Sequence, residues 1–326
     1  MMIEGGNMID VISYGEVMLR FTPERYRTFL SSNTWNVEVG GTEANVLVAL
    51  SLLGLKTEFI SFFPDNFLGF KAISELKKYG VGVEKVRLIP EGRMGLYFVE
   101  LHHRSKGIRV LYDRRDSSFS IGVLSDTDLE FIRKAKLIHL TGVTPSLSEV
   151  CKSNVIKICT SKKDSQILSF DINYRKKLWG EKECRRFLDI ILPFVDILFV
   201  KKEDYNLLFE EENNEEKILY KLQKTYGKDK IYVLTQGEEG CSVLYKDEYF
   251  SQQAYNTDVV DRIGAGDAFV AGFLYGYLKG KDLKNSAKYG SLLASIKMSI
   301  FGDFPALDRK TLLDLLESEN NRSVER

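Results

Sequence analysis

The sequence has few of the residues that build metal centres or disulfide frameworks. Its 326 residues include 3 histidines and 4 cysteines, and no two cysteines form a Cys-x-x-Cys pair. This scarcity argues against a metal site made of Cys and His, and scattered thiols are typical of proteins from a reducing compartment. We therefore expect a cytoplasmic protein.

A long apolar run and an excess of charge of one sign are also missing. No apolar stretch approaches the roughly 18 residues of a membrane span, and the first residues lack the apolar core of a signal peptide. The 46 basic and 46 acidic residues give zero net charge, which leaves no overall attraction to nucleic acid or to a membrane. We expect neither partner. Residues 1–7 are interpreted as a leader, with Met8 as an alternative start.

Two common nucleotide-binding motifs are absent as well. The sequence contains no G-x-x-x-x-G-K-[ST] loop, and no G-x-G-x-x-G follows the first predicted strand. The first absence excludes a P-loop enzyme, and the second argues against a dinucleotide-dependent oxidoreductase.

The sequence does contain short β-branched, apolar runs that alternate with longer amphipathic stretches. This alternation predicts βαβ units and a mainly parallel sheet. The predicted strands are Ile9–Ser13, Glu58–Phe62, Leu137–Leu140, Ile167–Asp171, Ile197–Val200 and Ile231–Thr235, and predicted helices include Ala44–Leu53, Phe67–Lys78 and Glu181–Leu192. Residues 15–39 and 93–113 hold short strands without intervening helices. We predict that these two segments form a small antiparallel flap.

The strongest local signal is the run from Asp261 to Phe269, which contains Gly264, Ala265, Gly266 and Asp267. Small residues before a predicted apolar helix, 268–278, let backbone amides approach an anion closely, and the helix dipole adds positive potential. An aspartate at this corner can accept a proton from an attacking hydroxyl. The simpler interpretation is a turn followed by a helix cap, and the run alone favours that interpretation.

Three further segments follow predicted strands or open helices, where ligands of open α/β sheets bind. Residues 235–240 form a glycine-rich turn that suits either nucleotide phosphate or a hairpin. Residues 39–45 contain paired glycines and Asn45 at a helix start. Asp171, Asn173 and Arg175 end a buried strand, where they form either a binding mouth or an internal Asp–Arg pair.

Taken together and in order, these segments resemble the ribokinase-like carbohydrate kinases, the phosphofructokinase-B family, from about Asp10 to Leu307. The matching stretches include 40–45, Leu53-Gly54, 64–69 and 261–269. The resemblance implies a three-layer α/β/α core with a mainly parallel sheet and a small antiparallel β lid. We assign residues 8–14, 40–92 and 114–326 to the core, and residues 15–39 and 93–113 to the lid.

The resemblance also implies a mechanism. The γ-phosphate of ATP would pass in line to a sugar hydroxyl, with Mg²⁺ bridging the phosphates. The resemblance allows a monovalent cation as a further cofactor and does not decide whether one is needed. Asp267 would be the base, and Gly264, Ala265 and Gly266 would form the anion hole. The nucleotide-binding residues implied are Thr235, Gly237, Gly240, Gly264, Gly266 and Ser291, and Asp204 is the indirect metal candidate. A homodimer is expected from the resemblance alone.

Several segments look like those of 2-keto-3-deoxygluconate kinases, among them 139–145, 171–175 and 95–97. That likeness places a sugar acid among Gly41, Asn45, Tyr97, Tyr112, Arg114 and Arg175. A carboxylate suits a fork-shaped guanidinium, which agrees with two arginines there. The alternatives are a fructokinase or another sugar kinase of the family, a nucleoside kinase, and a nucleotide- or sugar-binding protein without turnover.

The sequence departs from the family pattern at four positions. Asp113 stands in place of a tyrosine, and Ile263 stands where a small residue or threonine is usual. Lys201 replaces the asparagine of an Asn-x-x-Glu motif that tunes magnesium and phosphate, although Asp204 keeps the carboxylate. Ser291 replaces an asparagine near the adenine.

Overall fold

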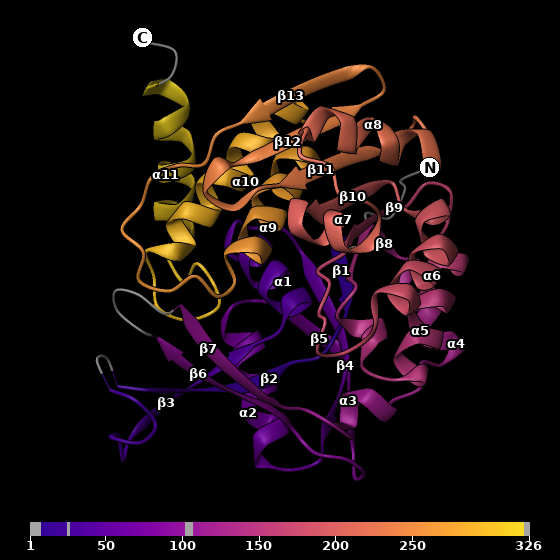
Figure 1. Cartoon of the computed structure of the whole chain (residues 1–326). Coiled ribbons are helices and arrows are strands. Elements are labelled where there is room, and N and C mark those ends of the chain that lie inside the picture. The colour runs from indigo at the N-terminus through magenta and orange to yellow at the C-terminus, as the bar shows by residue number, and fades with distance from the viewer. Residues whose placement is uncertain (1–7, 25–26, 102–106, 323–326) are drawn as a thin grey trace, which may run out of the picture.

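The computed structural model describes residues 8–24, 27–101 and 107–322. Within these ranges nine strands form one sheet in the order β13-β12-β11-β10-β9-β8-β1-β4-β5 (Figure 1). Its strands are β1 Ile9–Tyr14, β4 Thr57–Pro64, β5 Gly82–Ile89, β8 Ala135–Thr141, β9 Ile167–Asp171, β10 Ile197–Lys201, β11 Ile231–Thr235, β12 Cys241–Tyr245 and β13 Glu248–Gln252. All neighbouring pairs from β11 to β5 are parallel, and only the hairpins of β11, β12 and β13 are antiparallel.

Helices cover both faces of this sheet and give three layers (Figure 1). Adjacent side chains of a strand point to opposite faces, so Val11 packs in one hydrophobic cluster and Ile12 in the other. The first face is covered by α1 Thr42–Leu52, α2 Phe67–Lys78, α9 Ala265–Leu278, α10 Leu283–Met298 and α11 Arg309–Arg322. The second face is covered by α3 Ser118–Ile121, α4 Asp126–Ile132, α5 Glu149–Ser161, α6 Glu181–Ile191, α7 Lys202–Leu208 and α8 Glu215–Tyr226.

A second sheet projects from the core and forms the lid. Its strands are β2 Met18–Pro23, β3 Trp35–Gly40, β6 Gly95–Leu101 and β7 Ile108–Asp113, in the order β3-β2-β6-β7. The two outer pairs are antiparallel, but the central pair, β2 with β6, is parallel. The reason lies in the core: β2 and β6 continue from β1 and β5, which run in the same direction. Residues 25–26 and 102–106 of the two predicted lid segments, and the predicted leader, lie outside the described residues.

The sequence predicted this architecture, including the parallel core and the two-segment lid. Every predicted strand lies within an observed strand, and the predicted helices match α1, α2 and α6 to within two residues at each end. The division at residues 15–39 and 93–113 stays a prediction. In the described part of the chain, no helix is both long and apolar enough to cross a membrane.

Candidate active site

A cleft of about 300 Å³ lies between the carboxyl edge of the core sheet and the inner face of the lid. Neighbouring strands bring Thr141, Asp171, Lys201 and Thr235 to this edge, because Thr141 pairs with Asp171 and Lys201 with Thr235 in register. Among the residues predicted for the site, those that line the cleft are Gly41, Asn45, Tyr97, Tyr112, Arg114, Arg175, Gly264, Gly266 and Asp267. Chain segments more than 200 residues apart thus meet around one cavity.

Helix α9 supplies the anion-binding corner, and it begins at Ala265, three residues before the predicted start. Gly264 is the N-cap with a left-handed φ of 79°, and a Cβ there would collide with the carbonyl oxygen of Asp303. Glycine is therefore required on both grounds. The amide of Ala265 donates to the carbonyl of Arg262 at 3.2 Å. Ala265 was predicted to be part of the anion hole, but its amide is already used in this turn. The amides of Gly264 and Gly266, together with the helix dipole, remain to bind an anion.

Asp267 lies in the first turn of α9 and is only 8% exposed. It does not act as the helix cap of the simpler interpretation, because its carboxylate Oδ2 accepts a 2.6 Å hydrogen bond from Asn45 Nδ2. Asn45 is itself oriented, since its Oδ1 accepts from the amide of Gly41 at 3.2 Å. Burial raises the pKa of Asp267 to about 6, against the opposing effects of the Asn45 hydrogen bond and of Arg175. A carboxylate with this pKa is suited to accept a proton near neutral pH.

The end of β9 places more charge in the cleft. Burial raises the pKa of Asp171 to about 7, although Lys201 opposes the shift. Asn173 adopts a positive φ of 39°, which is uncommon for a residue other than glycine. Arg175 lines the cleft, and its guanidinium makes no ion pair with any carboxylate of residues 8–24, 27–101 or 107–322. The internal Asp–Arg pair considered from the sequence is thus not formed.

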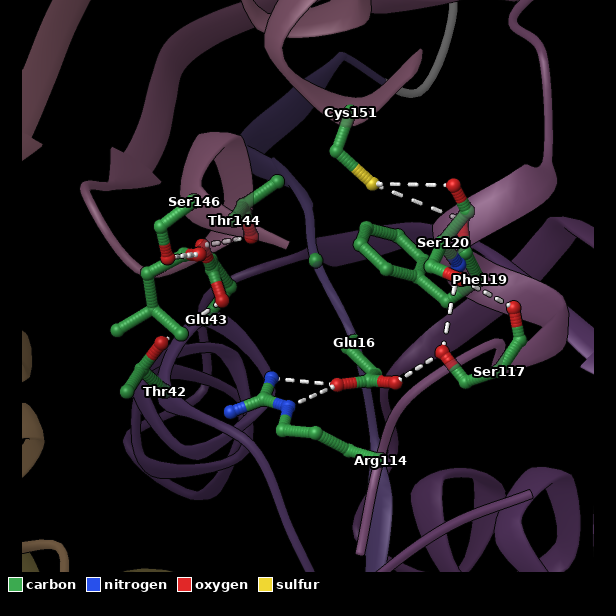
Figure 2. A network of polar contacts seen from close by, with 12 residues as sticks. Glu16, Thr42, Glu43, Arg114, Ser117, Phe119, Ser120, Thr144, Ser146 and Cys151 are labelled. Atoms are coloured by element: carbon green, nitrogen blue, oxygen red, sulfur yellow. Dashed lines mark hydrogen bonds and ion pairs between the residues drawn. The ribbon is translucent and has the colours of Figure 1, made fainter. Parts of the chain in front are cut away.

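The lid side of the cleft is held by paired groups. Arg114 donates from Nε to Glu16 Oε2 at 2.7 Å and also pairs with it through Nη2, while Glu16 accepts from Ser117 Oγ (Figure 2). Glu16 and Arg114 are 2% and 11% exposed at their side chains. The guanidinium expected to bind a substrate carboxylate is therefore already neutralised by a buried glutamate.

Two tyrosines line the same wall. The buried Tyr97 donates from its hydroxyl to Asp303 Oδ2 at 2.6 Å, and burial raises its pKa well above the usual range. Tyr112 stacks on Tyr97 with ring centroids 5.9 Å apart and remains 41% exposed. The ring of Tyr112 is thus accessible to a ligand, whereas the Tyr97 hydroxyl is already hydrogen-bonded to Asp303 of the core.

Sequence reasoning missed three carboxylates of the cleft, Glu16, Glu43 and Asp303. Glu43 is buried, and its carboxylate accepts hydrogen bonds from the hydroxyls of Thr42, Thr141 and Thr144 at 2.7–2.8 Å (Figure 2). Burial raises its pKa. The available signals were positional, because Glu16 follows the first strand and Glu43 lies within the paired-glycine motif.

Two of the six residues predicted for the nucleotide, Gly264 and Gly266, line this cavity, and the other four lie outside it. Thr235 ends β11, and Gly237 and Gly240 flank the short hairpin turn to β12. Gly240 has a φ of 104°, and a Cβ there would strike the carbonyl of Gln252. Ser291 is buried on α10 beside the thiol of Cys241. Their placement supports a structural role for Gly240 and leaves the nucleotide assignment of all four a prediction.

The metal candidate Asp204 lies in the first turn of α7, where its Oδ2 accepts from the amide of Tyr174 at 3.1 Å. Burial raises its pKa, and Lys201 opposes the shift. In the described part of the chain, no three His, Cys, Asp or Glu side chains are grouped as a metal site.

Comparison with known proteins decides the family. The description "pfkB family carbohydrate kinase" fits residues 8–306 of the chain. The chain belongs to the pfkB family of carbohydrate kinases. The family match covers both sheets and the start of α9, which together line the cleft described above.

Individual relatives within the pfkB family differ in sugar. The 2-dehydro-3-deoxygalactonokinase of Haloferax volcanii is 28% identical over 90% of this chain and 92% of its own length. Fructokinase-2 of Oryza sativa subsp. japonica is 30% identical over 91% of this chain and 90% of its own length. The crystal structure of 2-dehydro-3-deoxygluconokinase from Thermotoga maritima superposes with a TM-score of 0.88, at 28% identity over 95% and 98% of the two chains.

Proposed function

We propose that this pfkB kinase transfers the γ-phosphate of ATP to a hydroxyl of 2-keto-3-deoxygluconate, also called 2-dehydro-3-deoxygluconate. The observation that carries the choice of a sugar acid is the unpaired guanidinium of Arg175, which lines the cleft that also holds Asp267. Two relatives of similar identity bear names of 2-dehydro-3-deoxy sugar-acid kinases, which supports the same class.

In the proposed reaction, Asp267 orients the attacking hydroxyl and accepts its proton as the bond to phosphorus forms. The amides of Gly264 and Gly266 receive the equatorial oxygens of the transferring group, at the positive end of α9. Lys201 lines the same cleft and is the side chain that the sequence marked only as a departure. Its ammonium supplies positive charge next to the phosphoryl group. Catalysis is then a matter of positioning and charge, as phosphoryl transfer requires.

The donor chemistry of the site fits Mg²⁺ that arrives with the nucleotide. Mg²⁺ commonly takes one or two carboxylates together with substrate phosphates and water, and the absence of a three-ligand group in the described residues agrees with that mode. Asp204, through water, is the side chain we assign to it. The bound ion would neutralise phosphate charge.

Arg175 rather than Arg114 is assigned to the substrate carboxylate. A bidentate pair with a carboxylate needs a guanidinium that is free to form it, and Glu16 already occupies Arg114. The Arg114–Glu16 pair, Tyr112, Gly41 and Asn45 then shape the pocket for the hydroxyl groups of the sugar. A neutral ketose would gain nothing from Arg175.

A fructokinase is the second candidate, favoured by the 30% identity to the rice enzyme and by the Arg114–Glu16 pair, which suits hydroxyl groups. A binding protein without turnover is disfavoured, because Asp267 is present, buried and poised to ionise near neutral pH.

The test is an ATP-consumption assay with Mg²⁺ that compares 2-keto-3-deoxygluconate, fructose and ribose. We expect kcat/KM for the sugar acid to exceed the others by about 10- to 100-fold, since a charged hydrogen bond contributes roughly 1.5–3 kcal/mol. Preference for fructose would replace the sugar acid with a ketose, and no turnover would support the non-catalytic alternative.

The lid offers a surface for a second copy of the chain. Trp35, Val37 and Leu111 are exposed, and the lid register places Val37 and Leu111 on the same face as Phe21 and Phe98. We assign this apolar face to a homodimer contact, which sedimentation of the wild type against Leu111→Glu would test.

The four free cysteines are all buried, which supports a cytoplasmic location.

A further inference from the structure

A lysine is buried directly behind the anion-binding corner. Lys297, in the last turn of α10, is 0% exposed. Its Nζ donates to the carbonyl oxygen of Asp261 at 2.9 Å and to that of Ile300 at 3.3 Å. Removing an ammonium group from water costs several kcal/mol unless the protein replaces its hydration. Such a residue needs a reason to be buried.

The surroundings of Lys297 supply matching charge. Arg20 of lid strand β2 is also 0% exposed, and it donates to Asp261 Oδ2 at 2.6 Å and to Asp303 Oδ1 at 2.7 Å. Arg20 Nε also lies 3.9 Å from Oε2 of Glu38, whose side chain is 30% exposed, so two cations and three carboxylates form one largely buried cluster. Asp303 lines the cleft and raises the pKa of Asp267, so the charge of this cluster is felt at the proposed base.

The cluster also fixes the shape of the anion-binding corner. Asp261 accepts from the amides of Ile263 at 3.0 Å and Gly302 at 3.2 Å, and its own amide donates to the carbonyl of Met298 at 3.1 Å. Gly264 in turn packs against the carbonyl of Asp303. The turn before α9 and the loop after α10 are therefore packed together, and Lys297 is bonded to a carbonyl of each.

We propose that Lys297 is a positioning residue for phosphoryl transfer, whose buried ammonium holds the turn before α9 and the loop after α10 together. The inference rests on the anion-binding corner of the proposed function. Lys297 contacts neither the sugar nor the phosphate. It acts through Asp261 and through the positive charge that it adds behind the amides of Gly264 and Gly266.

Replacement of the ammonium would have two effects. The cluster would carry an excess of negative charge beside the place where the phosphoryl group gathers negative charge. Loss of the ammonium would also leave a cavity lined by the backbone carbonyls that it contacts, and carbonyl oxygens are suitable ligands for a monovalent cation. In this chain a tethered ammonium supplies that charge, so we expect wild-type turnover to be the same in sodium and in potassium salts.

A half-buried lysine with the same kind of contacts, Lys230, provides a control. Lys230 Nζ donates to the carbonyls of Pro193 at 2.9 Å and Val195 at 2.6 Å. It precedes β11, at the opposite edge of the sheet from the cleft. Lys230→Ala removes an ammonium from two carbonyls in the same way, so it measures what the loss of such contacts does to stability alone.

The experiment compares Lys297→Gln with Lys230→Ala, using the sugar that the wild type turns over fastest. We expect Lys297→Gln to lower kcat by about 10- to 100-fold, less than the loss of a direct oxyanion donor, with KM for the sugar nearly unchanged. Lys230→Ala should lower Tm and keep the wild-type kcat. A Lys297→Gln kcat within twofold of the wild type would show that the lysine is structural only.

A second variant guards against misfolding. Lys297→Ala is purified in ammonium chloride and assayed before and after exchange into sodium chloride at equal ionic strength. A kcat that falls on exchange, while wild type and Lys230→Ala are unaffected, supports the proposal; a kcat that is the same in both salts overturns it. Failure of the proposed sugar would appear in the wild type, so the two failures are distinguishable.

Discussion

The two walls of the cleft are built differently. The core wall carries Asp267 at the start of α9, Arg175 after β9 and Lys201 at the end of β10. Neither Arg175 nor Lys201 forms an ion pair with a carboxylate of the described residues. The lid wall carries charged and polar groups that are already bound: Arg114 to Glu16 and Tyr97 to Asp303. The core wall keeps its charges available for substrate, whereas the lid wall uses its charges to fasten lid to core.

This difference separates chemistry from stability. Substitutions on the core wall should change rates without lowering stability, and substitutions on the lid wall should lower stability. A variant that breaks this division would show that one of the walls has been assigned the wrong role.

The largest expected effect is that of Asp267→Asn. Loss of the base and of its charge should lower kcat by about 1,000-fold or more, since general base and electrostatic contributions each reach that order. Binding of ATP, measured by calorimetry, should be nearly unchanged. An unaltered kcat would remove Asp267 from the role of base.

The same variant should raise Tm at neutral pH. Burial raises the folded-state pKa of Asp267 to about 6 from an ordinary value near 4. A raised carboxylate pKa contributes stability that is fully present below about pH 4 and is lost as the pH rises through about 6, so the ionised carboxylate costs stability at neutral pH. A neutral asparagine avoids that cost, which is on the order of 1–3 kcal/mol. A Tm that falls instead would mean that the charge of Asp267 is stabilising.

Arg114→Ala comes next and tests the lid wall. It leaves the buried Glu16 without its partner, which should lower the free energy of unfolding by about 3–5 kcal/mol. Denaturant unfolding measures this loss. The double variant Arg114→Ala/Glu16→Gln should recover part of it, and additive losses would show that the pair is not coupled.

Arg175→Ala should have a smaller effect, confined to substrate. We expect KM for 2-keto-3-deoxygluconate to rise by about 10- to 100-fold, as the loss of a charged hydrogen bond implies. KM for fructose and Tm should hardly change. Equal changes for both sugars would take the carboxylate away from Arg175.

The sequence predicted the core wall better than the lid wall, for a physical reason. Each core-wall group follows its own strand or opens its own helix, so local pattern together with the rule for parallel sheets places it. The lid wall depends on pairing between distant segments: Glu16 and Arg114 are 98 residues apart in sequence. No local pattern records which carboxylate meets which arginine.

Two further differences have local causes. Helix α9 starts at Ala265 because packing of Gly264 against Asp303 and the contact of Asp267 with Asn45 outweigh the poor helix propensity of glycine at 266. Lys297 passed unnoticed because a lysine in a helix normally lies at the surface. Only the tertiary structure shows that its ammonium is enclosed by carbonyls.

The pH dependence of kcat/KM tests the central assignment most directly, because Asp267 must be ionised to accept a proton. The account predicts an acid limb with a midpoint near 6, the pKa to which burial raises Asp267, with activity falling about tenfold per pH unit below it. Asp171 lies close enough to couple to this titration, so the limb reports the pair. Activity that stays constant down to about pH 4.5, near the ordinary pKa of a carboxylate, would contradict the account.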